Sequence, residues 1–438
     1  MTARPQDIPE DVVPFYDAIA DRLLWMLDEG DAAVVPGPVK EEFVAYLCDV
    51  LGVPAETISV SSLRANGVAD WYPGHHTDLI TNLRKVIDGN RSAEWTVECY
   101  IRDREIIAWE TELSARGRAA STFAQGIAEL MNTKSVFRNL AQAAGAPIAE
   151  GRVATRGDEL IDAVIDLLAK TGAVIVKQDQ NSGGDGNALI TTDKSIPSIG
   201  AYRSLRITRS DSAAVRSALA EAGLHEEVEV PSGCCPAKYV VEVYHPRSRT
   251  FYVELHIPEH SAPYLLNYGD MRMSPLWSGF EIPAQGLPAA QHARLCADAQ
   301  QLAVLAQRVG YHGLINCDAI IDQHGEILFT EFNGRAGGCT HIDIIARRLL
   351  GEDYLRNYVL LTQNAVKSPA FSKLLTLLAD ASLLFCRDRR AGIIVAQDNT
   401  AVTGTIEYIA IGRDHDEALD YEHRLQVALD NANKLVTV

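Results

Sequence analysis

Hydrophobic positions recur along the chain with two spacings, one typical of helices and one typical of strands. The helical spacing predicts amphipathic helices over residues 12–27, 40–51, 158–170, 291–309, 341–350, 371–384 and 414–435. Alternating or continuous apolar runs predict strands over residues 57–61, 96–101, 105–109, 173–176, 188–191, 238–244, 250–257, 392–397 and 403–411. Because helices and strands are interspersed, the pattern indicates a mixed α/β (α+β) chain.

Residues 313–338 contain two further apolar runs, which flank the turn sequence DQHG. Each run alternates as a strand should, so the segment predicts a β-hairpin with a four-residue loop. The simplest register pairs Ile321 with Glu326. This hairpin is the part of the sequence that concentrates polar chemistry.

In that register Asn316 lies opposite Glu331, and Asp318 lies diagonal to Glu331 on the same face of the sheet. Asn333 follows Glu331 by two positions and points to that face as well. Two converging carboxylates repel each other unless a cation lies between them. Oxygen ligands of this kind suit Mg²⁺, although a solvated acidic face is the alternative interpretation.

Arg335, Gly337 and Gly338 follow directly after the hairpin. A guanidinium and the backbone N–H groups of glycines can both bind anions. The stretch therefore predicts a combined magnesium and phosphate site.

Lys134 lies in the first turn of another predicted helix, whose N-cap is Asn132 or Thr133. The apolar positions of this helix are Val136, Phe137, Leu140, Ala141 and Ala144. A lysine is mildly unfavourable at the positive end of a helix dipole, so a bound phosphate would account for it. A solvated lysine is the alternative.

Lys177 ends the predicted strand over residues 173–176 and precedes the glycine-rich loop DQNSGGDGN. Glycines in such a loop free backbone N–H groups to surround phosphate oxygens. The loop is not a P-loop, because no G-K-[ST] follows and a strand is expected next. Glu242 is embedded in the apolar strand over residues 238–244, where it can accept a hydrogen bond from an amine or lie on a solvent face.

Composition narrows the function. The chain has 438 residues and a net charge of −18, which disfavours nucleic-acid and anionic-membrane partners. Its eight cysteines show no C-x-x-C spacing, so a zinc site or a disulfide scaffold is not expected. No apolar run reaches 18 residues and the first residues lack a signal-peptide pattern, so we expect a cytoplasmic protein.

The motifs taken together resemble the ATP-grasp superfamily of carboxylate–amine ligases over about residues 120–350. They are Lys134 opening a helix, Lys177 before a glycine loop, the strand VVEVY, and the spacing D-x12-E-x-N-x-R-x-G-G. The chain is also similar to the pheganomycin-type peptide ligase family through the stretches MNTKSVFRNLAQAAGAP, VIVKQDQNSGGDGN and TEFNGRAGGCTHI.

The resemblance implies an ATP-grasp fold, in which two α+β lobes hold the nucleotide. Residues 1–118 would form a pre-ATP-grasp domain and residues 361–438 a small C-terminal domain. Within the ATP-grasp domain, residues 119–360, a mobile lid would cover residues 152–236 and the large lobe residues 237–360.

The resemblance also implies site roles. The residues implied for ATP are Lys134, Lys177, Ser182, Gly183, Gly184, Gly186, Asn187, Glu242, Val243 and His245. Those implied for magnesium, usually two ions, are Asp318, Glu331 and Asn333; those implied for catalysis are Arg335, Gly337 and Gly338; and those expected near the substrates are Arg272 and His341. Many members place a ribose-binding acid soon after the hinge strand, where this chain has Arg247-Ser248-Arg249. Glu254 is the nearest candidate, and the ribose contacts stay open.

The implied activity joins an amino-acid or peptide carboxylate to an amine through an acyl phosphate, with ADP and phosphate as products, in specialised metabolism. Small-molecule substrates are the expected partners, and a homodimer is left open. Two alternatives remain: a small-molecule kinase on the same fold and a non-catalytic nucleotide-binding protein.

Overall fold

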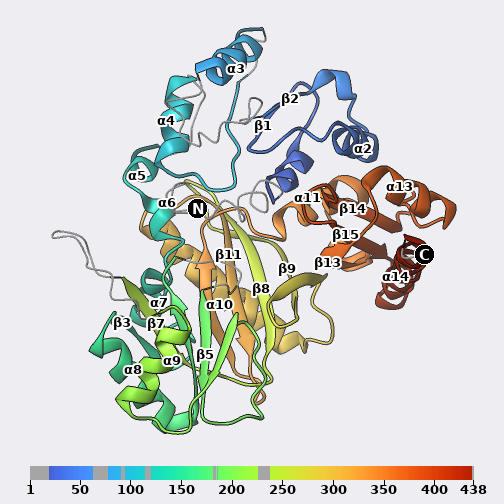
Figure 1. Cartoon of the computed structure of the whole chain (residues 1–438). Helices are drawn as coiled ribbons and strands as arrows, with labels where there is room; N and C mark the ends of the chain where they lie inside the picture. The colour runs from blue at the N-terminus through green and yellow to red at the C-terminus, as the bar shows by residue number, and fades with distance from the viewer. Residues whose placement is uncertain are drawn as a thin grey trace. The chain divides into compact units, whose positions relative to one another are not determined.

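The computed structural model describes residues 19–62, 77–89, 94–113, 120–180, 184, 186–224 and 237–436. The chain divides into two compact units, drawn in Figure 1. Unit 1 consists of Met1–Gly126, Gly279–Pro283 and Arg335–Val438, and unit 2 consists of Ile127–Ser278 and Ala284–Gly334. Each unit is described by itself.

The first sheet of unit 2 has five strands in the order β3-β7-β4-β5-β6. Its strands are β3 (Gly151–Thr155), β7 (Lys238–Val243), β4 (Ala173–Gln178), β5 (Asn187–Thr191) and β6 (Arg203–Arg206). Helices α8 (Asp158–Thr171) and α9 (Ser212–Glu221) pack together, and α8 contacts β3, β4 and β7 (Figure 1). Leu160, Val164 and Val241 lie in the core between helices and sheet, which forms because one face of each strand is apolar.

A second set of strands in unit 2 is antiparallel, with β12 (Ile327–Asn333), β11 (Gly313–Ile321), β8 (Arg249–Ile257) and β9 (Tyr264–Met273) side by side. The helix α10 (Ala289–Arg308) packs on β8, β9 and β11. Cys317 on β11 faces this helix and is fully buried, so its neighbours along the strand, Asn316 and Asp318, belong to the opposite face.

Helices α6 (Ile127–Leu130) and α7 (Lys134–Ala143) open unit 2. Helix α7 contacts β12 from one sheet and both β7 and β3 from the other. The rings of Phe137 on α7 and Phe332 on β12 meet edge to face with centroids 5.1 Å apart. One helix therefore packs against both sheets of the unit.

In unit 1, β13 (Val359–Lys367) pairs with β15 (Thr405–Gly412), which pairs with β14 (Gly392–Asn399). The last two residues of β10 (Trp277–Ile282) pair with β13. The accompanying helices are α11 (Thr340–Leu350), α12 (Tyr354–Asn357), α13 (Phe371–Asp380) and α14 (His415–Val436). Helix α14 contacts β13, β14 and β15.

The N-terminal part of unit 1 carries a two-stranded parallel sheet of β1 (Ala32–Val35) and β2 (Ser59–Ser62). Its helices are η2 (Ala20–Met26), α2 (Glu41–Leu51), η3 (Ala55–Thr57), α3 (Thr77–Gly89), α4 (Arg104–Glu112) and α5 (Ala120–Ala124). Of the helix predicted over residues 12–27, the described part is the 3₁₀ helix η2.

Two predicted strands in this part are wrong. Residues 105–109 lie inside α4, because the Asp103 side chain accepts hydrogen bonds from the backbone N–H groups of Glu105 and Ile106 and so caps a helix. Residues 96–101 form no strand, and the Tyr100 carbonyl accepts a hydrogen bond from the Ala336 N–H.

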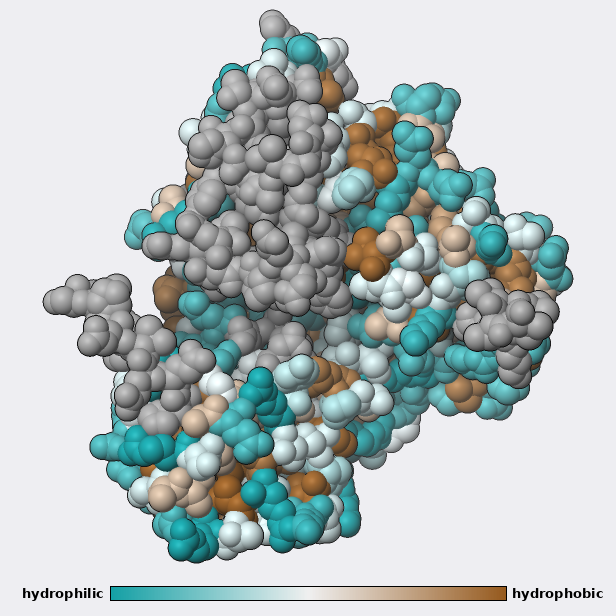
Figure 2. All heavy atoms as spheres, in the orientation of Figure 1, coloured by the Kyte–Doolittle hydropathy of each residue, from teal (hydrophilic) through white to brown (hydrophobic). Residues whose placement is uncertain are grey.

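No helix within the described ranges is both long and apolar enough to cross a membrane. On the face drawn in Figure 2, hydrophobic residues occur as small separate patches among hydrophilic ones. Such small patches are expected, because most apolar side chains of the helices and sheets are buried in the cores.

Candidate active site

The predicted hairpin is present as β11 and β12, but its register differs from the expected one. Ile321 pairs with Ile327, so the loop has five residues, and a bulge between Asp318 and Ala319 shifts the register once more. The loop is longer because the Asp322 carboxylate accepts hydrogen bonds from the N–H groups of His324 and Glu326. The expected register was wrong by these two steps.

The shift brings the two acidic residues closer than predicted. Asp318 lies directly opposite Glu331, and Asn316 lies directly opposite Asn333. The expectation that all four share one face of the sheet is confirmed. The Asn333 amide donates to the Asp318 carboxylate at 3.4 Å.

This donor set fits Mg²⁺. No cluster of three or more His, Cys, Asp or Glu side chains suited to a metal occurs in the described part of the chain. Mg²⁺, however, is usually held by one or two carboxylates together with substrate phosphates. Asp318 and Glu331 provide such a pair, and a rotation of the Asn333 amide would add its oxygen.

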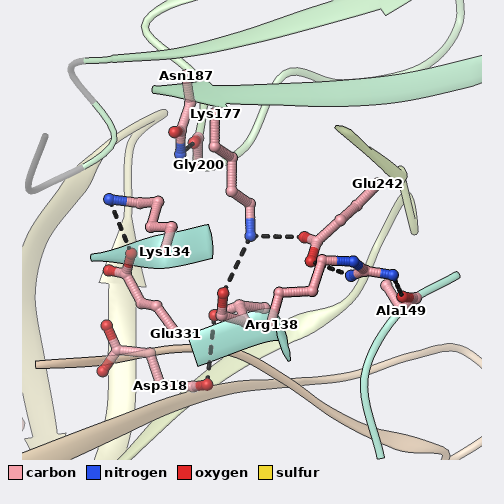
Figure 3. Close-up of polar contacts among 10 residues, drawn as sticks. Lys134, Arg138, Ala149, Lys177, Asn187, Gly200, Glu242, Asp318 and Glu331 are labelled. Atoms are coloured by element: carbon pink, nitrogen blue, oxygen red, sulfur yellow. Dashed lines mark hydrogen bonds and ion pairs between the residues drawn. The ribbon is translucent and has the colours of Figure 1, made fainter. Parts of the chain in front are cut away.

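Lys134 reaches this pair from α7. Its ammonium lies 3.0 Å from the Glu331 carboxylate, and the side chain is buried (Figure 3). The N-cap of α7 is Thr133, as expected, but the hydroxyl makes no capping bond. Instead Asp179 caps the helix, since its carboxylate accepts from the Ser135 N–H at 2.6 Å and its carbonyl from the Lys134 N–H at 3.0 Å.

Lys177 and Glu242 are close neighbours on one face of the five-stranded sheet. Glu242 pairs across the strands with Ile175, and Lys177 lies two positions further along β4. The Lys177 ammonium lies 2.7 Å from one carboxylate oxygen of Glu242, and the Arg138 guanidinium lies 2.7 Å from the other (Figure 3). All three side chains are buried.

Lys177 also connects this group to the acidic hairpin. Its ammonium donates to the Thr330 carbonyl at 3.3 Å, and Thr330 directly precedes Glu331. The Thr330 hydroxyl in turn donates to the Asp318 carbonyl at 3.2 Å. Both predicted lysines therefore converge on the strand that carries Glu331.

The glycine-rich loop is described in part, and Ser182 and Gly183 lie outside the described residues. Gly184 has φ +85°, and a Cβ there would lie 3.1 Å from the Gly200 carbonyl oxygen, so the position requires glycine. The Gly186 carbonyl accepts from the Gln178 N–H. The Asn187 amide donates to the Gly200 carbonyl at 2.9 Å, and this bond holds the end of the loop.

The predicted hinge residues already have partners. The Val243 N–H donates to the Glu150 carbonyl at 2.8 Å. The His245 carbonyl accepts from the Ser248 hydroxyl at 2.9 Å, and its ring lies 3.6 Å from the Asp322 carboxylate. Their adenine contacts stay predictions.

Arg272 lies on β9, and its substrate role stays a prediction. The remaining predicted residues belong to unit 1. Arg335 lies over the Tyr100 ring, 5.4 Å from its centroid. The Gly337 N–H donates to the Thr340 hydroxyl at 2.7 Å, so this predicted anion donor already has an acceptor.

His341 is fully buried in unit 1 beside Glu407. The distance from its Nε2 to the Glu407 carboxylate is 3.4 Å, and the Arg22 guanidinium lies 2.8 Å from the same carboxylate. Burial lowers the pKa of His341. Burial alone would raise the pKa of Glu407, but Arg22 and then His341 outweigh it and bring it to about 2.

Several residues that organise the site were not found in the sequence. Arg138 follows Lys134 by four positions, which places both on one face of α7, a spacing that a search for polar helix faces would detect. Asp179 begins the glycine-rich loop and gave no signal of a capping role. A buried network on β8 and β9 lies beside the acidic hairpin, and the sequence had singled out only its Glu254. In it Tyr252 donates to Asn267, and Asn267 donates to Glu254 at 2.6 Å.

Comparisons with known proteins find family matches for two segments, one in the N-terminal and one in the C-terminal part of the chain, and solved structures with the same fold. Residues 20–115 match the model of the Pre ATP-grasp domain, and residues 373–425 match the model of the PGM1 C-terminal domain. No curated protein sequence matches the chain. The predicted domain boundaries stay predictions.

Three solved structures represent the fold neighbours. The ADP complex of purK, an N5-carboxyaminoimidazole ribonucleotide synthetase, has a TM-score of 0.56 and 14% identity over 92% of this chain and 97% of that one. The biotin carboxylase domain dimer of the Hydrogenobacter thermophilus 2-oxoglutarate carboxylase, with MgADP, ADP and bicarbonate, has a TM-score of 0.54 and 12% identity over 89% and 87%. The L-amino acid ligase of Bacillus licheniformis has a TM-score of 0.51 and 11% identity over 92% and 98%.

The predicted fold class is confirmed: the chain has the ATP-grasp fold of these neighbours, with a pre-ATP-grasp domain and a C-terminal domain. At these identities the likeness shows the fold alone. The activity has to be argued from the site.

Proposed function

We propose that the chain is an ATP-dependent ligase that joins a carboxylate to an amine through an acyl phosphate. The observation that supports this most is the convergence of two buried lysines from separate elements on the acidic hairpin. Lys134 pairs with Glu331, and Lys177 bonds the residue before it. Two cations beside two facing carboxylates suit a nucleotide whose phosphates and metal ion lie between them.

The chemistry requires activation of the carboxylate. An amine cannot displace hydroxide from a carboxylate, so the γ-phosphoryl group of ATP is first transferred to a substrate oxygen. Lys134 and Lys177 would bind the phosphate oxygens and spread the charge that develops during this transfer. Mg²⁺ bound at Asp318 and Glu331 would supply further charge neutralisation.

The amine then attacks the acyl phosphate, and phosphate leaves with ADP as the other product. Arg335 follows Asn333 by two positions, and we assign it to the acyl phosphate and its tetrahedral successor. Water would hydrolyse the acyl phosphate, so residues 152–236 are proposed to close over the nucleotide as a lid that hinges on the strand near Glu242. Glu242, Val243 and His245 are the proposed contacts of the adenine.

The proposed substrates are an amino acid or peptide and an amine, in specialised metabolism. One fold neighbour is an L-amino acid ligase, and others were crystallised with ADP or MgADP, which supports this class of reaction. The pheganomycin-type peptide ligases remain the proposed subfamily. The matches to a Pre ATP-grasp domain and a PGM1 C-terminal domain support that arrangement of domains.

A phosphate-release screen tests the function. The protein is incubated with MgATP and pairs of amino acids, and products are identified by mass spectrometry. Free phosphate, ADP and a product whose mass is the sum of the two substrates minus water support the ligase. ADP with a stable phosphorylated product and no free phosphate would favour a kinase, and nucleotide binding without turnover over the full matrix would favour a binding protein.

A further inference from the structure

Arg138 is a buried cation whose position in the site calls for a role. It lies on α7, one turn after Lys134, and is 3% exposed. One terminal nitrogen donates to Glu242 at 2.7 Å and the other to the Ala149 carbonyl at 3.0 Å (Figure 3). Arg138 therefore fixes Glu242 relative to the chain that enters β3.

Glu242 is shared between two cations. Arg138 binds one of its carboxylate oxygens and Lys177 the other, each at 2.7 Å. Two positive charges and one negative charge leave one positive charge in excess within this triad. Because the three groups are buried, this charge is weakly screened and favours a nearby anion.

Lys177 is the member of the triad that can use the excess charge. Its ammonium also bonds the Thr330 carbonyl and so lies toward the acidic hairpin. With Arg138 in place, Glu242 cannot neutralise Lys177 completely. Without Arg138, Glu242 and Lys177 would cancel one for one, and the attraction for an anion would fall.

Stability alone explains Arg138 poorly. Burying an ion pair costs desolvation energy, and apolar residues of similar volume often serve as well. The Nε of Arg138 is buried and has no hydrogen-bond partner among the described residues, which adds to that cost. A role of Arg138 in attracting an anion would explain why the protein tolerates this desolvation cost.

We propose that Arg138 is a positioning residue for a nucleoside triphosphate: by binding Glu242 it leaves the Lys177 ammonium incompletely neutralised and available to the phosphates. The proposal rests on the proposed function, because it requires that a nucleotide binds between Lys177 and the acidic hairpin. It goes further by assigning the two groups different roles: the Lys177 ammonium binds the phosphates, and the Glu242 carboxylate contacts the adenine.

The test compares two ligands that differ in charge. Affinities for a non-hydrolysable ATP analogue with Mg²⁺ and for adenosine are measured by calorimetry on the full chain. In Arg138→Met we expect the analogue to bind about tenfold more weakly, the loss of roughly one charge-assisted interaction, with adenosine changed much less. Arg138→Lys keeps the charge and should fall between Arg138→Met and the unmodified protein.

A double variant separates charge from packing. Arg138→Met combined with Glu242→Gln removes one charge of each sign, so Lys177 regains its excess charge. We expect the ratio of analogue to adenosine affinity to recover toward that of the unmodified protein. Arg152→Met, on β3 in an exposed pair with Asp166, is the control and should leave the ratio unchanged.

Each outcome decides. Equal losses for both ligands in Arg138→Met, or no recovery in the double variant, would overturn the role of Arg138 and leave the proposed function standing. If the unmodified protein binds neither ligand, the proposed function fails and this inference fails with it. Should Arg138→Met not fold, Arg138→Gln, which removes the charge but keeps a polar side chain, takes its place in both the single and the double variant.

Discussion

Gly151 and Glu242 are direct cross-strand partners on β3 and β7, and a Cβ at Gly151 would lie 2.9 Å from the Glu242 Cγ and 2.3 Å from the Val241 carbonyl oxygen. The absence of a side chain at Gly151 leaves the space that the buried Glu242 side chain uses. The backbone oxygen cannot move away without breaking the sheet, so the strand has no cheap way to accommodate a larger residue.

Gly151→Ala should therefore destabilise the protein by about 1–3 kcal/mol, as overpacking does, and weaken binding of a non-hydrolysable ATP analogue. Urea denaturation and calorimetry would measure the two effects. Gly89→Ala is the matched control, since a Cβ there meets nothing within 4 Å. Wild-type stability and affinity in Gly151→Ala would contradict this account of the Glu242 pocket.

Asp179→Ala should loosen the start of α7. Loss of a helix cap costs about 1 kcal/mol, and here it also removes the support of Lys134. We expect lower thermal stability together with weaker binding of the ATP analogue. Asp211→Ala removes the cap of α9, so it should cost similar stability without the loss of binding. Equal binding in the two variants would count against a link between the cap and Lys134.

Glu331→Gln tests the metal site. If Glu331 and Asp318 hold Mg²⁺, the variant should lose about a hundredfold or more in turnover, since metal ions supply several kcal/mol of charge stabilisation. It should also need more Mg²⁺ for half-maximal rate. Glu326→Gln, on an exposed residue at the end of the same hairpin loop, is the control. An unchanged Mg²⁺ requirement in Glu331→Gln would exclude this carboxylate as a ligand.

Arg335→Ala separates binding from chemistry. Because Arg335 is assigned to the acyl phosphate, we expect the affinity for the ATP analogue to stay within about twofold while amide formation is lost, as for a group that acts only in the transition state. Calorimetry and the phosphate-release assay measure the two quantities. Arg413→Ala, a largely exposed arginine, should be neutral in both. An active Arg335→Ala enzyme would refute the catalytic role.

The buried pair of His341 and Glu407 predicts how stability depends on pH. The folded-state pKa of Glu407 is about 2, below its ordinary value of 4.5, and that of His341 is also lowered from 6.5. The unfolded chain therefore binds more protons, and acid favours unfolding. The free energy of unfolding should fall as the pH drops below about 6.5, and fall further between about 4.5 and 2.

Urea denaturation at a series of pH values measures this trend. His341→Phe should flatten the part of the profile that begins near pH 6.5, because the titrating ring is gone. Glu407→Gln should cost about 3–5 kcal/mol at neutral pH, because Arg22 then lacks its buried partner. A stability that rises on acidification would show that these groups do not titrate as described.

The sequence predicted those parts of the site that depend on local pattern. The start of α7 at Lys134, the strand that ends near Lys177 and the acidic hairpin all follow from periodicity and turn residues, and the structure has them. The bulge after Asp318 could not be predicted, because an extra residue in a strand leaves the alternation of side chains on each side intact.

The spacing of hydrophobic and polar residues could not predict contacts between segments that lie far apart in the sequence. Arg138 and Glu242 are separated by 104 positions, and nothing in either stretch states that they meet. The strand predicted over residues 105–109 failed for a local reason instead. Its apolar residues fit a strand, but the Asp103 side chain accepts hydrogen bonds from the first backbone N–H groups of the segment and so stabilises a helix.

Lys134 and Arg138 pair with carboxylates on two different sheets, yet one helix carries both. Each residue of an α-helix turns the next by about 100°. A single residue inserted between them would therefore rotate one guanidinium or ammonium away from its partner while the other stayed in place. The four-residue spacing of Lys134 and Arg138 must therefore be kept for both ion pairs to form. We expect α7 to tolerate substitutions between them more readily than insertions or deletions.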